Sequence, residues 1–219
     1  MYHGFETLRV DNEFGVRDIP YSKSEKSSDK RDYRPSVFII PPMNGTMWEA
    51  KSVALRERFA QHDEGCVAFG YSDLNDTTAR RVDFSIYRSI DDTRQMFERI
   101  TEGPQIVVAS SFGATAALKL AQQYPERVAG LVLIAPGVSI NKQMLKKHLA
   151  DEKRRLDYET KGFAEMHVFS YPNPENTGVS ASKIKKYRVQ KAELDKAARE
   201  EVIKPRKKIV LECPVLIIH

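Results

Sequence analysis

The sequence predicts an α/β fold, with a mostly parallel β-sheet whose strands are joined by crossover helices. Two observations support this prediction. Short apolar runs alternate along the chain with helical segments of about ten to fifteen residues, the pattern of strand–helix–strand units. In addition, the apolar run at 105–108 leads directly into a tight turn and a helix of small residues. With 219 residues, 41% hydrophobic and 30% charged, the chain suits one folded domain with an insertion.

The first 35 residues precede the alternating pattern and are expected to form a hairpin followed by an exposed loop. Segments 5–10 and 14–19 are predicted to pair as strands, with Asp11 and Asn12 near the turn. Residues 21–34 are rich in serine, lysine and aspartate, which is typical of an exposed loop.

The predicted core of the fold occupies residues 36–139. Its apolar runs are expected to be buried strands, because each is short and is followed by turn or helix signals. These strands are 36–40, 66–70, 105–108 and 130–135. An exposed turn, to which we assign no chemistry, is expected at Asp73, Asn75 and Asp76.

Capping patterns predict where the core helices begin. Thr46 with Glu49 forms a capping box that opens a helix ending near residue 62. Ser89 and Asp92 are expected to cap a second helix that runs through residue 100, and a third helix covers 114–124.

Residues 140–208 are predicted to be a helical insertion. Their pattern is helical, although its apolar periodicity is weak and the stretch 171–174 interrupts it with two prolines. The sheet is expected to return within residues 209–219, where 214–218 is an apolar strand. An unpaired edge at this strand would favour self-association of the chain.

A serine stands at the apex of the turn that follows the third strand. Ala109 and Gly113 flank Ser111 two residues away on either side, and a turn this tight admits only small side chains there. Such a pattern also arises by chance, but a strand before it and a helix after it favour a nucleophile elbow, which exposes the serine hydroxyl. Ser110 does not fit, because bulky residues stand at its own flanking positions.

From about residue 36 to 136 the chain resembles the α/β-hydrolase fold family. The elbow and the run from Tyr124 to Pro136 (Tyr-Pro-Glu-Arg-Val-Ala-Gly-Leu-Val-Leu-Ile-Ala-Pro) carry the resemblance, and residues 214–219 look like a later strand of the same fold. The resemblance implies a serine hydrolase that acts on an ester, thioester or related acyl bond of a small molecule through Ser111. It also implies that the insertion at 140–208 is a cap over the active site.

The resemblance further implies an oxyanion hole made of two backbone N–H groups. One is expected from Phe112, the residue after the nucleophile. The other is expected from the loop after strand 36–40, where relatives often read His-Gly and this chain has Pro41-Pro42, which carry no N–H. The usual donor of the family is the next residue, which is Met43 in this chain. Met43 and Phe112, with Met47 and Trp48, could line an apolar acyl pocket, although the last two equally suit the core contacts of the first helix.

The general base and its acid partner are not identifiable in the sequence. The family order is serine, acid, histidine, with the acid after the strand that corresponds to 214–218. His219 resembles a structural histidine at the end of that strand, and His148 and His167 lie in the insertion. His3 and His62 precede the elbow and are expected at the surface. We therefore expect the 219-residue chain to be a very poor catalyst, ending as it does before both positions.

The net charge of +5 is unevenly distributed. Residues 141–208 hold 18 Lys and Arg against 10 Asp and Glu, which gives +8. The basic residues gather at 183–191 and 204–208. A solvated helical surface explains them, and the alternative is a basic lid that attracts an anionic substrate or a membrane surface. No aromatic-interleaved or helix-turn-helix pattern accompanies the charge, so nucleic acid is not an expected partner.

Composition also limits the cofactors and the compartment. No metal-ligand cluster, phosphate-binding glycine loop or dinucleotide motif is present, so no cofactor or metal is expected. No apolar run approaches the roughly 20 residues that span a bilayer, and residues 1–10 show no signal peptide. Cys66 and Cys213 fit buried thiols better than a disulfide, which favours a cytoplasmic location.

Two further functional hypotheses stay open beside the serine hydrolase. A non-catalytic member of the fold family would use its pocket or its basic insertion for binding. A non-hydrolytic enzyme on the same fold is the other, because fold does not fix chemistry.

Overall fold

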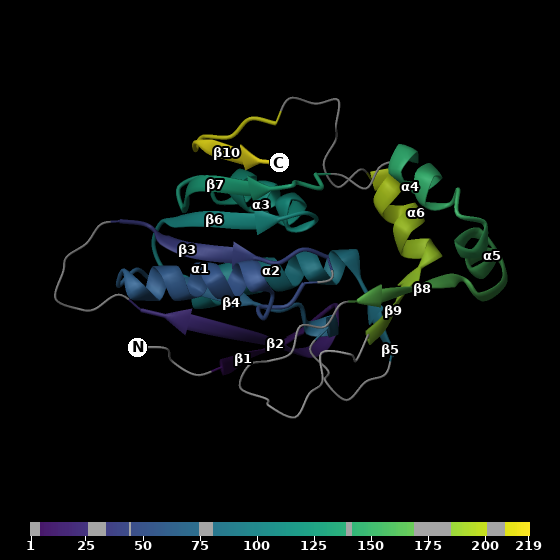
Figure 1. Cartoon of the computed structure of the whole chain (residues 1–219), viewed down its shortest axis with the longest axis horizontal. Coiled ribbons are helices and arrows are strands. Elements are labelled where there is room, and N and C mark those ends of the chain that lie inside the picture. Colours follow the sequence, from purple (N-terminus) through teal and green to yellow (C-terminus); the bar gives the residue numbers. More distant parts are fainter. Residues whose placement is uncertain are drawn as a thin grey trace.

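The structure is a computed structural model that describes residues 5–25, 34–43, 45–74, 81–138, 142–168, 185–200 and 209–219. Its centre is a seven-stranded sheet in the order β1-β2-β4-β3-β6-β7-β10, parallel from β4 to β10 (Figure 1). The mostly parallel sheet that the sequence predicts is confirmed. The strands are β1 Phe5–Asn12, β2 Gly15–Ser24, β3 Ser36–Ile40, β4 Cys66–Phe69, β6 Gln105–Ser110, β7 Val128–Ile134 and β10 Val215–Ile218.

Helices cover both faces of this sheet. Alternate residues of β3 and β6 point to opposite faces, so each strand contributes to two apolar clusters. Helix α1 (Ala50–Gln61) packs on the face that contains Val37 and Val108. Helices α2 (Ile86–Ile100) and α3 (Gly113–Gln123) pack on the face that contains Phe38 and Val107.

The insertion, residues 140–208, contains helices and also part of a second sheet. The three-stranded sheet has the order β5-β9-β8 and joins β5 (Arg81–Phe84) of the core to β9 (Lys185–Gln190) and β8 (Phe163–Val168). The purely helical prediction was therefore wrong for β8 and β9. Buried and half-buried residues alternate along Tyr187–Gln190, which is the two-residue period of a strand.

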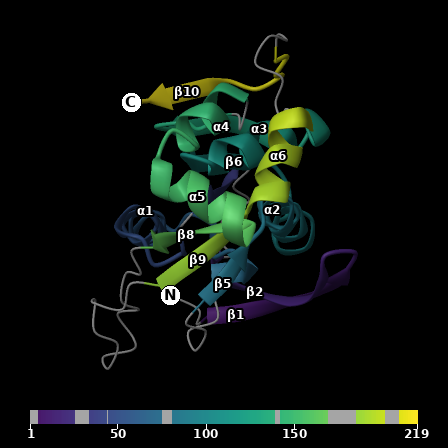
Figure 2. The same cartoon turned by 90° about the vertical axis from the view of Figure 1, so that its right-hand side faces the viewer.

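The helices of the insertion are α4 (Lys142–His148), α5 (Glu152–Lys161) and α6 (Lys191–Glu200). With β8 and β9 they lie beyond the carboxyl ends of the parallel strands, to the right of the sheet in Figure 1. From that side, α5, α6 and β9 stand in front of the sheet (Figure 2). Residues 171–174 and 204–208, which the sequence analysis singled out, are outside the described residues.

Helix α1 differs from its predicted start. It begins at Ala50, after an extended Glu49 whose side chain makes no cap bond, and the Thr46 hydroxyl accepts a bond from the N–H of Trp48 at 3.2 Å. The predicted capping box is therefore absent. The helix ends at Gln61, close to the predicted residue 62.

Helix α2 begins earlier than predicted, because Ser85 is its cap and accepts a bond from the N–H of Arg88 at 3.2 Å. Ser89 and Asp92, the predicted caps, lie inside the helix and are buried. Ser89 donates its hydroxyl proton to the Ser85 carbonyl at 2.8 Å. The polar spacing that suggested a cap belongs instead to the buried face of the helix.

The predicted hairpin forms, but its second strand is longer than expected. Residues 21–24 are part of β2 and pair with β4, with Tyr21 buried opposite Phe69. Residues 26–33 of the predicted loop are outside the described residues. Asp73 is also buried rather than exposed, and it accepts bonds from Arg88 and from the N–H of Ser85. Asn75 and Asp76 are not among the described residues.

Candidate active site

Ser111 occupies the bend between β6 and α3, and its backbone is in the left-handed region with φ 50°. A residue with a side chain rarely adopts this conformation, and it persists where the surroundings impose it. The Ser111 N–H donates to the Ile134 carbonyl at 3.0 Å. The Ser111 carbonyl accepts from the N–H groups of Ala114 at 3.1 Å and Gly137 at 2.8 Å. The residue is exposed, so the bend presents its side chain to solvent at the carboxyl end of the sheet.

The positions on either side of Ser111 are tightly enclosed. A Cβ on Gly113 would lie 2.6 Å from the carbonyl oxygen of Pro41 and 3.0 Å from that of Ile40, so only glycine fits. Ala109 is fully buried in β6, where it lies between Ile40 of β3 and Leu133 of β7. These contacts bring the end of β3 against the start of α3.

Gly137, which follows β7, also packs closely against the bend. A Cβ there would approach the Ser111 carbonyl carbon at 3.3 Å and the Phe112 nitrogen at 3.4 Å. The Thr115 hydroxyl donates to the Gly137 carbonyl at 2.8 Å. The segment that follows β7 is thus bonded to both the bend and the first turn of α3.

The two predicted oxyanion donors lie on the two segments that meet here. Phe112 precedes α3, and within the described residues its N–H has no hydrogen-bond acceptor. Its buried ring packs edge-on against Phe84 of β5, with centroids 6.2 Å apart. Met43 is half-buried, two residues after the Pro41 carbonyl that borders Gly113. The structure therefore brings the loop at 41–43 to the elbow.

Ser110 faces a different environment from Ser111. Its hydroxyl accepts a bond from Lys51 of α1 at 2.8 Å, in a small hollow that Glu49 and Pro42 also line. Burial raises the pKa of Glu49 to about 7, although the nearby Lys51 opposes this shift. No sequence pattern indicated this group, because its members come together only when α1 packs on β6.

The histidine side chains that the structure describes either have other partners or are exposed. His148 contacts the Tyr158 hydroxyl through Nε2 and Arg154 through Nδ1, both at 3.1 Å, and burial followed by the Arg154 charge lowers its pKa. His62 and His219 are exposed. His3 is outside the described residues, as is the side chain of His167. Throughout the described part of the chain, no histidine or carboxylate hydrogen-bonds with Ser111.

Some of the charged side chains of the insertion form ion pairs. Arg188 contacts Asp83 at 2.8 Å, and Lys191 contacts Asp195 at 2.6 Å. Lys146 and Lys147 are exposed at the end of α4. Lys183 and the cluster at 204–208 are outside the described residues. Part of the predicted basic surface therefore serves ion pairs within the insertion.

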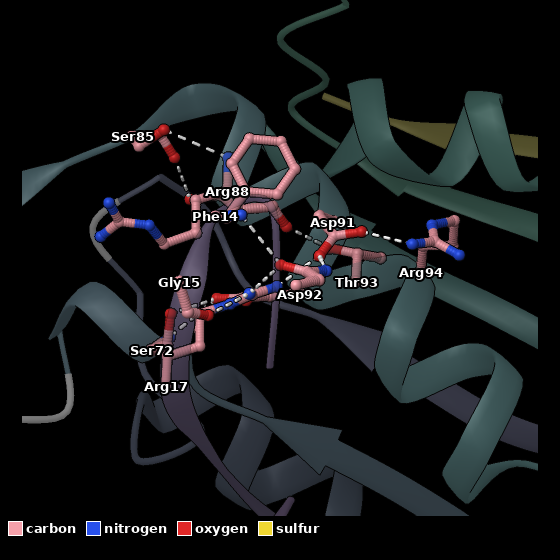
Figure 3. A network of polar contacts seen from close by, with 12 residues as sticks. Phe14, Gly15, Arg17, Ser72, Ser85, Arg88, Asp91, Asp92, Thr93 and Arg94 are labelled. Carbon is pink, nitrogen blue, oxygen red and sulfur yellow. Dashed lines mark hydrogen bonds and ion pairs between the residues drawn. The ribbon is translucent and has the colours of Figure 1, made fainter. Parts of the chain in front are cut away.

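A buried polar network, which the sequence analysis also missed, fastens the hairpin to α2 (Figure 3). The Arg17 guanidinium bonds with Asp91 and, at 2.6 Å, with Asp92. Asp92 also accepts bonds from the N–H of Ser72 at 2.9 Å and from its hydroxyl at 2.8 Å. The network thereby fixes the segment that follows β4, in which Tyr71 donates a hydrogen bond to the Pro41 carbonyl.

Two kinds of feature are absent from the part of the chain that the structure describes. No group of three or more His, Cys, Asp or Glu residues that could hold a metal is found among the described residues. None of their helices is both long and apolar enough to cross a membrane. Cys66 is buried, which raises the pKa of its thiol to about 12, and Cys213 is partly buried and unpaired with it.

The parallel sheet, its flanking helices and the strand–bend–helix at Ser111 define an α/β-hydrolase fold. A family model described as serine aminopeptidase, S33, matches residues 67–204. The chain therefore belongs to this family of α/β-hydrolases.

Individual relatives agree with this assignment. The human protein named palmitoyl-protein thioesterase ABHD10, mitochondrial, is 24% identical over 204 residues, which are 92% of this chain and 60% of the relative. The chain thus spans about 60% of the length of this curated relative. The structure of mouse alpha/beta hydrolase domain-containing protein 10 superposes with a TM-score of 0.65 at 20% identity, over 97% of this chain and 76% of that chain. Est1E from Butyrivibrio proteoclasticus superposes with a TM-score of 0.62 at 12% identity, over 97% of this chain and 76% of that chain.

Proposed function

We propose that the chain is a serine hydrolase that cleaves an ester or thioester bond through Ser111. The observation that carries the proposal is the exposed serine held at φ 50° between β6 and α3. Acyl transfer needs a nucleophile that can reach its substrate and donors that stabilise the tetrahedral oxyanion. Phe112 and Met43 would supply these donors through their backbone N–H groups, with Ala109 and Gly113 allowing the bend.

The substrate we propose is a small acyl compound, and the relatives favour a thioester. The human relative is named a palmitoyl-protein thioesterase, and the family model is described as a serine aminopeptidase. The insertion lies beyond the carboxyl ends of the strands, where a cap over Ser111 would lie (Figure 2). Exposed Lys146 and Lys147 on α4 would favour an anionic substrate.

We also propose that the chain reacts slowly as it stands. A serine hydroxyl is a weak nucleophile until a base removes its proton. No histidine or carboxylate among the described side chains hydrogen-bonds with Ser111, so in this proposal hydroxide performs the step. The rate at Ser111 should then rise about tenfold per pH unit, without the inflection near pH 6.5 that a histidine base produces.

The test is covalent labelling with a fluorophosphonate, followed by intact-protein mass spectrometry and peptide mapping. We expect the full chain to acquire one adduct over hours, faster at pH 9 than at pH 7. Ser111→Ala should abolish the adduct. Ser110→Ala is the matched control and should keep it, because Ser110 bonds with Lys51 instead of facing solvent.

Other outcomes separate the alternatives. No adduct on any serine would favour a non-catalytic binding protein, the second candidate, which the lack of a base among the described residues supports. Labelling within seconds, with a pH inflection near neutrality, would contradict the slow reaction and reveal a base.

Two further expectations stay predictions. The four exposed apolar residues of β10 favour self-association of the chain along this edge. A cytoplasmic location was expected from the free cysteines, whereas the human relative is named as mitochondrial.

A further inference from the structure

The backbone of the loop that follows β3 can make few hydrogen bonds. Pro41 and Pro42 have no N–H, so they cannot donate hydrogen bonds. Their carbonyl groups accept instead: Pro42 from the N–H of Gly45 at 2.8 Å, and Pro41 from the hydroxyl of Tyr71 at 2.9 Å. The Tyr71 bond is therefore an anchor from a distant part of the chain.

The Pro41 carbonyl is also the group that touches the elbow. It lies where a Cβ of Gly113 would be 2.6 Å away, so the oxygen packs against the first residue of α3. One carbonyl thus has Tyr71 on one side and the elbow on the other. Met43 follows two residues after this carbonyl, so the orientation of the Pro41 peptide affects the direction of the Met43 N–H.

Tyr71 is itself held rigidly. It is fully buried, and its ring stands edge-on to Phe69 with centroids 5.6 Å apart. The next residue, Ser72, is bound twice by Asp92, which Arg17 holds in turn (Figure 3). Burial raises the pKa of the Tyr71 hydroxyl, so it stays a protonated donor.

We propose that Tyr71 is a positioning residue for the reaction at Ser111. Its hydroxyl holds the Pro41 carbonyl so that the N–H of Met43 and the N–H of Phe112 face the same oxyanion. This inference rests on the proposed hydrolase function. It makes the buried network around Arg17 and Asp92 the support of one wall of the active site.

Tyr71→Phe tests the inference, because it removes one oxygen and leaves the ring in place. The matched control is Tyr124→Phe. Tyr124 lies at the opposite end of α3, and its hydroxyl donates a hydrogen bond to Glu98. The measurement is fluorophosphonate labelling over a range of probe concentrations, which separates the maximal rate from the half-saturating concentration. Loss of a complete oxyanion donor costs about 100-fold or more, so misalignment in Tyr71→Phe should lower the maximal rate about tenfold. The half-saturating concentration should stay within about twofold, since the ground state makes little use of these donors.

Ser72→Ala is a second variant, in case Tyr71→Phe does not fold. It removes one of the two bonds between Ser72 and Asp92, and we expect the maximal rate to fall about two- to threefold. An unchanged maximal rate in a folded Tyr71→Phe, or an equal fall in Tyr124→Phe, overturns the role of Tyr71. If instead the unmutated chain is not labelled at Ser111, the hydrolase proposal fails first and the positioning role falls with it.

Discussion

Strand β7 has two parallel neighbours of similar composition and very different surroundings. On one side, β6 is almost entirely buried, with Val107 and Ala109 fully covered. On the other side, the four apolar residues of β10 are between 41% and 56% exposed. Strand β6 is enclosed by β3, α1 and α3, whereas β10 pairs with β7 alone among the described strands.

The difference shows that the hydrophobic pattern of a strand does not determine how deeply the strand is buried. An apolar run predicts a strand, but burial depends on which helices and strands the rest of the chain supplies. The enclosed neighbour bears the elbow, where a strained serine needs a rigid setting. The exposed neighbour bears an edge that can pair with another strand.

The largest expected difference between the two neighbours is their tolerance of a charge. Val107→Lys places an ammonium group in the core and should unfold the chain, because burying an unpaired charge costs several kcal/mol. Ile217→Lys should change the melting temperature by less than about 2 °C and reduce self-association, since charged residues on edge strands oppose pairing. Thermal unfolding and sedimentation velocity measure the two effects. Equal destabilisation by both variants would remove the distinction between β6 and β10.

A smaller effect tests the strain at the enclosed end. Ser111→Gly should stabilise the chain by about 0.5–1 kcal/mol, because glycine adopts φ 50° without the penalty of a side chain. The melting temperature should rise about 1–3 °C while labelling at this position is lost. Ala109→Gly is the control within β6 and should destabilise, since it only adds flexibility to a strand. A fall in melting temperature for Ser111→Gly would contradict the stored strain.

The smallest effect concerns Glu49, on the α1 side of the enclosed region. Its pKa is about 7 in the folded chain and near 4.5 when unfolded, so the folded state holds the proton more tightly. Stability should therefore fall as the pH rises from 4.5 to 7 and stay lowered above it. Because Glu49 is only half-buried, solvent screens its charge and only part of this shift affects stability. Glu49→Gln should raise the melting temperature about 1–2 °C at pH 8 and change it less at pH 4.5. The exposed Glu57→Gln is the control, and the same pH response there would discount the burial of Glu49.

Sequence patterns predicted the strands of the central sheet and the bend at Ser111 because their signals are local. The parallel strands are short apolar runs, and the bend needs small residues at fixed positions such as Gly113. The second sheet was missed since its pairing is distant: Asp83 of β5 lies opposite Arg188 of β9. No window of sequence contains both.

The roles of the buried polar residues could not be predicted for the same reason, and one of these residues gave a misleading signal. Asp92 resembled a helix cap in the sequence, yet its partner, Arg17, lies in the hairpin 75 residues earlier. Tyr71 carried no pattern at all, because its role depends on a carbonyl of Pro41 that only the packed sheet brings within reach. Signals of this kind become visible only when the elements are assembled.

The hydrogen bonds of Gly137 tie the segment after β7 to the bend at Ser111. The chain leaves β7 and is fastened to Ser111 and Thr115 before it enters the insertion. The two bonds at Gly137 therefore hold the chain in place shortly before the insertion begins. We expect that lengthening or exchanging the insertion leaves the backbone conformation of Ser111 unchanged, because these bonds lie outside the insertion.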